Sequence, residues 1–141
     1  MPQKAYLINT NRSGCPNGRD ERDMLANAKC AAYFSPWKEK IKKLQEGDLV
    51  FLYSNKRGII ARGVATGIVQ AADHEDENGI HWDEEYYMKL HDFDILSSPM
   101  PAASICSAAG QRIMFGQTLT PLRGETGKAI WDVITEHYNT R

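Results

Sequence analysis

Amide, guanidinium and hydroxyl side chains follow directly on an apolar segment near the N-terminus. The segment KAYLIN ends at Asn9, and Asn11, Arg12 and Ser13 come soon after it. Amide and hydroxyl groups both donate and accept hydrogen bonds, so they can recognise the polar edge of a planar ligand such as a nucleobase. The same residue types are common in turns. The pattern therefore fits either a binding loop or an ordinary turn.

Tryptophan offers a large ring face for stacking against a planar ligand. Trp37 stands in the segment SPW, where it is either a pocket wall or, with Ile41 and Leu44, part of the apolar stripe of a short helix. Trp82 has polar and charged neighbours in an expected loop, which favours a rim position. Trp131 fits a helix residue packed on the sheet. Weaker candidates are Ser35 and Ser54 as polar contacts and Phe34, Tyr53 and Phe115 as walls.

A catalytic or metal site has little support in the sequence. His74, His81 and Glu85 are the best metal-ligand set, but their spacing matches no recognised pattern, and solvated loop residues explain them better. Cys15 is a thiol in an expected loop, and nothing in the sequence brings a histidine to it. The segment RGETGK, residues 123–128, lacks the first glycine and the Ser or Thr of a phosphate-binding loop. We therefore predict no catalytic residues, no metal ligands and no cofactor.

The strongest structural signal is the run GDLVFLYSNKRGIIARGVATG, residues 47–67. It predicts a turn, a buried strand, a tight Lys-Arg-Gly turn and a second strand, which together form a β-hairpin. Gly63 and Gly67 predict bulges or sharp bends, because a glycine inside a strand has no side chain to pack. Such bends curl a sheet into a small barrel, and a plain hairpin of any α+β domain is the alternative.

This hairpin, the segment KAYLIN and the tripeptide SPW together resemble the EVE domain and the related YTH domain, both branches of the PUA-like fold. The resemblance spans about residues 5–138. It implies an α+β fold with a partly open β-barrel of five or six strands flanked by helices. It also implies non-catalytic binding of a modified, typically methylated nucleobase in DNA or RNA, with Trp37 and Trp82 as walls of an aromatic cage. The further ligand contacts in this interpretation are Asn9, Asn11, Arg12, Ser35 and Tyr53.

Two other classes of function stay open. A small nuclease or nucleobase-acting hydrolase could be built on the same fold, with a His, Asp and Glu group that we do not recognise. An interaction module without a nucleic-acid ligand would fit the acidic second half of the chain. Fold analogy alone does not decide between these classes.

Charge is unevenly distributed, although the net charge is −1. Residues 1–72 carry 12 Lys or Arg and 6 Asp or Glu, giving +6, whereas residues 73–141 carry 5 and 12, giving −7. The basic residues in or near the hairpin are Lys38, Lys40, Lys42, Lys43, Lys56, Arg57 and Arg62. We expect Lys42, Lys43 and Arg57 to contact the nucleic-acid backbone with a salt-dependent affinity. A solvated helix face is the alternative for the lysines.

Length and composition suit one domain that covers residues 1–141, with 42% hydrophobic residues. The sequence has no apolar stretch long enough for a membrane span and no signal-peptide pattern, so it predicts a cytoplasmic protein with no membrane partner. Three widely spaced cysteines predict free thiols rather than a disulfide framework or a zinc site.

Periodicity and turn residues predict the remaining elements. The first ones are a strand over 5–9, an exposed loop over 10–18, a helix capped by Asp20 and a short helix near 36–44. The next ones are an acidic loop over 73–79, a strand over 85–93 ended by prolines, a helix over 102–109 and a short strand within 114–122. Thr126 is expected to cap a final helix whose buried stripe is Ile130, Val133, Ile134 and Tyr138.

Overall fold

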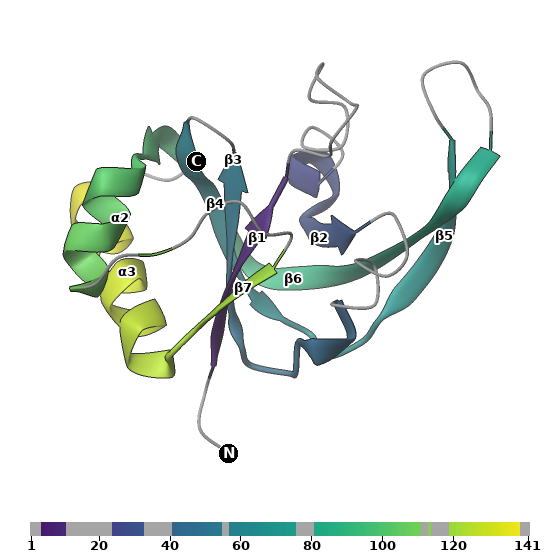
Figure 1. Ribbon diagram of the computed structural model, residues 1–141, viewed down its shortest axis with the longest axis horizontal. Helices are drawn as coiled ribbons and strands as arrows, with labels where there is room; N and C mark the ends of the chain where they lie inside the picture. The colour runs from purple at the N-terminus through teal and green to yellow at the C-terminus, as the bar shows by residue number, and fades with distance from the viewer. Residues whose placement is uncertain are drawn as a thin grey trace.

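The computed structural model of the protein describes residues 4–10, 24–32, 41–54, 57–75, 81–110, 113 and 119–138, with the side chains of 32, 71–75 and 81–85 excepted. The elements in chain order are β1 (Ala5–Asn9), β2 (Lys29–Ala32), β3 (Leu49–Ser54), β4 (Gly58–Ala65), β5 (Gln70–Glu75), β6 (His81–Met100), α2 (Ala102–Ala109), β7 (Leu119–Leu122) and α3 (Gly124–His137) (Figure 1). Short helical turns lie at 24–27 and 41–43. Within the described part of the chain, no helix combines the length and the apolar composition that a membrane crossing needs.

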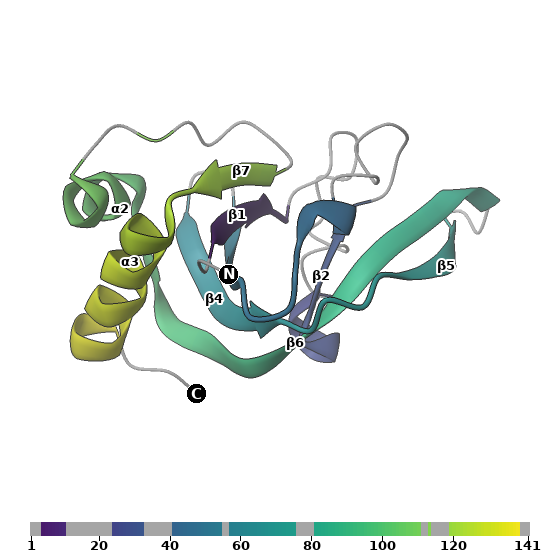
Figure 2. The same ribbon diagram turned by 90° about the horizontal axis from the view of Figure 1, so that it is seen from below.

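The seven described strands form one curved sheet. Its order is β2-β6-β4-β3-β1-β7, and β5 is a further partner of β6. Strands β1 and β3 are parallel, and the other pairs are antiparallel. Figure 2 shows the sheet curling into a partly open barrel with α2 and α3 together on one side. The predicted α+β fold class is confirmed, with one strand more than the five or six expected.

The central strands β1 and β3 are buried on both faces, which explains why each is a continuous apolar run. In β3, Val50 and Leu52 belong to the core inside the barrel, which we call the inner core. Phe51 belongs to a second core between the sheet and the helices, which we call the helix-side core. Helix α3 contributes Ile130 and Ile134 to this core, as the predicted buried stripe of the helix requires. This alternation decides which strand residues can reach the barrel interior.

The Gly-Asp pair before β3 has a structural role. Gly47 has a φ of +90°, in the left-handed region that favours glycine. The Asp48 carboxylate accepts hydrogen bonds from the backbone N–H groups of Lys4 at 3.2 Å and Gln45 at 2.9 Å. Asp48 is only 5% exposed. The carboxylate therefore joins the start of β1 to the turn before β3 and holds the parallel pair in register.

The structure confirms three predicted elements, namely the hairpin at 47–67, the strand at 5–9 and the helix at 102–109. It also confirms the bulge predicted at Gly63, because the register between β4 and β6 shifts there. The loop predicted over 73–79 is wrong for 73–75, because these residues pair with β6. Strand β6 also continues through Pro99. Thr126 does not cap α3, because the helix begins at Gly124 and its N-cap is Arg123, without a side-chain hydrogen bond. The predictions for Asp20 and for residues 11–18 lie outside the described residues.

Candidate functional site

The C-terminal ends of β1 and β3 meet at one end of the barrel because these strands are parallel, and we call this the β1–β3 end. Asn9 lies opposite Tyr53 in the register. The backbone N–H and the hydroxyl of Thr10 donate to the Tyr53 carbonyl at 2.9 and 3.1 Å. The Arg57 N–H donates to the Ser54 carbonyl at 3.0 Å in the following turn. The fold thus brings three predicted site residues, Asn9, Tyr53 and Arg57, to one end.

Strand alternation assigns these residues to different faces. Tyr53 is 6% exposed and belongs to the helix-side core, where burial raises the pKa of its hydroxyl and nearby Cys106 adds to the effect. Thr10 and Ser54 take the alternate positions, on the side of the inner core, and are 1% and 2% exposed. Tyr53 therefore packs as a core residue. The exposed loop expected from residue 10 is wrong for Thr10, because this residue is buried and its hydroxyl joins the end of β1 to β3.

Most of the predicted base contacts stay predictions. Asn11, Arg12, Ser35 and Trp37 lie outside the described residues. Trp82 lies within β6, where the strand pairs with β5, and its side chain is not described. The loop expected around Trp82 is therefore wrong, because pairing with β5 extends β6 back to His81.

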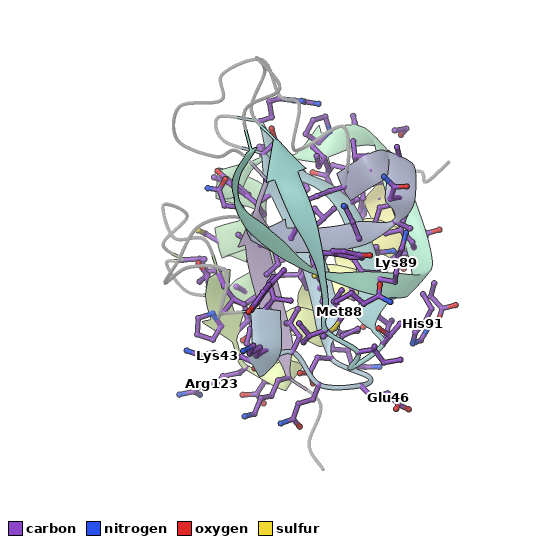
Figure 3. All side chains as sticks on the ribbon, turned by 90° about the vertical axis from the view of Figure 1, so that its right-hand side faces the viewer. Lys43, Glu46, Met88, Lys89, His91 and Arg123 are labelled. Carbon is purple, nitrogen blue, oxygen red and sulfur yellow. The ribbon has the colours of Figure 1, made fainter. Side chains whose placement is uncertain are left out.

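The three residues predicted to contact the nucleic-acid backbone lie at opposite ends of β3. Lys42 and Lys43 are exposed in the turn before this strand, where Figure 3 labels Lys43. Arg57 is exposed in the turn after the strand. Strand β3 has six residues and spans about 20 Å at about 3.3 Å per residue. A single nucleotide therefore cannot reach both groups, whereas a strand several nucleotides long can.

Lysines also surround two tyrosines of β6, a cluster that the sequence reasoning missed. The Nζ atom of Lys42 lies 5.1 Å from the ring centre of Tyr86, and that of Lys29 lies 4.5 Å from the ring centre of Tyr87. Lys29 lies opposite Lys89 in the β2–β6 register, and the Lys89 ammonium donates to the Asn27 carbonyl at 3.0 Å. This cluster depends on the pairing of β2 with β6, which joins residues distant in the sequence.

Arg62 is not available to a phosphate, although it belongs to the basic set near the hairpin. It is 7% exposed, and its guanidinium donates to the Trp131 carbonyl at 2.9 Å and to the Thr135 hydroxyl at 2.7 Å. The same group pairs with Asp94 at 3.2 Å and lies 4.3 Å from the Trp131 ring centre. Trp131 also packs edge-on against Phe51, which confirms its predicted place between helix and sheet.

The described residues give no support to a nucleophile or a metal site. Among them, no three His, Cys, Asp or Glu side chains are grouped to hold a metal ion. Cys30 and Cys106 are free thiols, as predicted. Burial raises the pKa of the Cys30 thiol to about 12, and its Sγ donates to the Met88 carbonyl at 3.8 Å. A thiol that stays protonated at neutral pH is a poor nucleophile.

The raised pKa of Cys30 predicts a loss of stability at high pH. The folded protein holds this thiol neutral, so its contribution is complete below about pH 9 and is lost as the pH rises toward about 12. Above pH 9, we expect the free energy of unfolding of the native protein to fall by roughly 1 kcal/mol per pH unit more than that of the Cys30→Ala variant. Urea unfolding at a series of pH values measures both slopes. Equal slopes would contradict the prediction, because the tyrosines titrate in both proteins.

No protein-family model matches the chain, and none of the curated proteins matches it by sequence. Solved structures do match its fold. Human THYN1, solved in complex with DNA containing 5-methylcytosine, superposes with a TM-score of 0.56 at 12% identity, over 93% of this chain and 97% of that one. The Mmi1 YTH domain, solved in complex with RNA, gives 0.57 at 8% identity, over 96% and 79%. PSPTO5229 from Pseudomonas syringae gives 0.54 at 14% identity, over 92% and 98%. The chain therefore shares the fold of these structures, one of which is a YTH domain, and this agrees with the fold that its resemblance to the EVE and YTH domains implies.

Proposed function

We propose that the protein binds a methylated nucleobase within DNA or RNA and leaves that base chemically unchanged. The observation that carries this proposal is the fold likeness over 93% and 96% of the chain to two domains solved on nucleic acids, one of them DNA containing 5-methylcytosine. Both domains differ strongly from this chain in sequence, so the ligand assignment also depends on the residues at the candidate site.

We place the base at the β1–β3 end. Trp37 and Trp82 form the walls of an aromatic cage in this proposal, because a methyl group gains dispersion and loses contact with water between two ring faces. Polar groups around the end of β1 read the edge of the base. The polar contacts proposed from the sequence are Asn9, Asn11, Arg12 and Ser35. Tyr53 supports this end from the helix-side core.

The backbone of the nucleic acid follows the basic residues. Arg57 contacts phosphates beside the base, and Lys42 and Lys43 contact phosphates several nucleotides away, as their separation along β3 requires. We treat residues 1–141 as one binding domain. We also place it in the cytoplasm, because the free thiols of Cys30 and Cys106 suit a reducing compartment.

Replacing Trp82 by alanine is the direct test of the cage. We expect the affinity for a methylated oligonucleotide to fall roughly ten- to a hundredfold, because a lost stacking wall costs about 1–3 kcal/mol. The unfolding temperature should hardly change, since a rim residue contributes little to the core. Fluorescence titration with methylated and plain oligonucleotides measures the affinities, and mass spectrometry of the recovered oligonucleotide checks that the base is unaltered.

The matched control is Ile68→Ala. Ile68 is 64% exposed in the turn between β4 and β5, so its replacement removes exposed apolar surface, and we expect it to leave the affinity unchanged. The cage is refuted if Trp82→Ala behaves like this control, or if it unfolds the protein. Turnover of the oligonucleotide above a buffer control would favour a hydrolase or nuclease instead.

A further inference from the structure

Thr10 follows the last residue of β1 and binds the end of β3 twice. Its backbone N–H and its hydroxyl donate to one acceptor, the Tyr53 carbonyl, at 2.9 and 3.1 Å. Strands β1 and β3 lie side by side and are parallel (Figure 1), so both leave the sheet at the β1–β3 end. Thr10 is 1% exposed. The two hydrogen bonds therefore form a buried link between the strand ends, which we call the Thr10 clamp.

The sheet itself does not require the hydroxyl of this clamp. The backbone N–H of Thr10 already continues the pairing of β1 with β3. Valine would suit a buried position at the end of a strand at least as well as threonine. The hydroxyl binds a carbonyl that has another donor, so it adds a restraint on the chain and does not rescue an orphaned group.

The end of β3 is irregular, which gives such a restraint a purpose. The register between β3 and β4 shifts between Leu52 and Tyr53, and a shift of this kind interrupts the ladder. The Thr10 clamp holds the Tyr53 carbonyl at this interruption. Arg57 is held separately, because its N–H donates to the Ser54 carbonyl at 3.0 Å within the turn.

We propose that Thr10 is a positioning residue of the nucleic-acid site, a proposal that rests on the proposed function. Its neighbours in the sequence, Asn9 and Asn11, are two of the polar groups assigned there to the edge of the base. At 1% exposure Thr10 offers a ligand almost no surface, so it acts through these neighbours. A chain that is fixed between them before binding loses less entropy when the base is bound.

The test removes the hydroxyl and keeps the shape of the side chain. Thr10→Val retains the backbone N–H, whereas Thr10→Ser retains the hydroxyl. The matched control is Thr120→Val, because Thr120 is 8% exposed in β7, the other neighbour of β1. Fluorescence anisotropy measures the affinity of each protein for three oligonucleotides of one sequence, in DNA and in RNA form. Their target position carries 5-methylcytosine, cytosine or an abasic site, and thermal unfolding checks the fold of each variant.

We expect Thr10→Val to bind the methylated oligonucleotide roughly three- to tenfold more weakly than the native protein, because the polar groups beside it must then be ordered on binding. The affinity for the abasic oligonucleotide should change less than about twofold, since its phosphates still meet Arg57, Lys42 and Lys43. Thr10→Ser and Thr120→Val should bind like the native protein. The unfolding temperature of Thr10→Val should fall by only a few degrees, because one uncharged hydrogen bond is lost.

Equal losses on the methylated and the abasic oligonucleotide would overturn the proposal, because they would report a general effect on the fold. Native-like binding by Thr10→Val, or a loss that also appears in Thr10→Ser, would overturn it as well. Unfolding of Thr10→Val would make Thr10 a residue of stability alone.

The proposed function has a separate criterion. It fails if the native protein binds the methylated and the plain oligonucleotide equally, and the comparison with the abasic oligonucleotide then still tests Thr10. A native protein that binds all three equally, or none of them, would refute both proposals.

Discussion

Replacing Arg62 by alanine is expected to lower the free energy of unfolding by about 2–4 kcal/mol. The guanidinium is 7% exposed and joins three elements, since it contacts Asp94 of β6 together with Trp131 and Thr135 of α3. Its removal leaves the Trp131 ring face without its cation and takes one donor from the Trp131 carbonyl, which keeps the Thr135 hydroxyl as a second donor at 3.1 Å. The loss stays moderate because the Asp94 side chain is 34% exposed and regains water. Urea unfolding, followed by the fluorescence of the tryptophans, measures it.

Two variants separate this structural role from phosphate binding. Arg62→Lys keeps the charge but loses the planar fork, so it should retain part of the stability and leave the salt dependence of oligonucleotide binding unchanged. Arg57→Ala removes an exposed guanidinium, so it should change stability by less than about 0.5 kcal/mol and reduce the slope of log affinity against log salt by about one. A stable Arg62→Ala protein with a reduced salt slope would show that Arg62 binds phosphate.

The elements that the sequence predicts well are those in which local preference and tertiary packing agree. Strand β3 is an unbroken apolar run next to a turn that requires glycine at position 47, and Asp48 fixes its start. The helix at 102–109 lies between Pro101 and Gly110, which ends it in the left-handed conformation. The boundaries of these two elements are therefore set by local residue types, above all by glycine and proline.

The elements that the sequence misses depend on distant partners. Strand β2 has only four residues, which include Lys and two Ala and have little preference for strands, and it forms because it pairs with β6. Residues 73–75 have the composition of a loop and are strand for the same reason. The local sequence does not indicate that β2 and β5 pair with β6. The cluster of lysines and tyrosines on β6 therefore could not be predicted.

The candidate site is predicted only in part, for a geometric reason. The sequence places Asn9 at the end of a strand and Tyr53 in the hairpin, but the pairing of these strands and the faces on which their residues lie are decided by the two cores of the barrel. A shift of one residue moves a side chain from one core to the other. Thr10 and Ser54, rather than Tyr53, therefore lie on the side of the inner core.

Replacing Gly127 by alanine is expected to destabilise the protein by about 2–4 kcal/mol, although alanine is the better helix former by about 1 kcal/mol. Helix α3 crosses β1 at this glycine, and a Cβ atom there would clash with the Ala5 Cβ atom. Ala5 is fully buried at the start of β1, between β3 and β7, so the helix would have to move away from the helix-side core. Urea unfolding compares the variant with Lys128→Ala, a change at the exposed next residue that should have little effect.

The double variant Ala5→Gly with Gly127→Ala tests the contact itself. It moves the methyl group from the strand to the helix and restores the space between them, so it should recover much of the stability lost by Gly127→Ala. Ala5→Gly alone should cost about 1 kcal/mol, because glycine weakens a strand interior. A favourable coupling energy of at least about 1 kcal/mol is therefore expected from the four proteins. Additive effects would mean that α3 does not rest on the start of β1, and that its attachment to the sheet depends instead on Ile130 and Ile134 in the helix-side core.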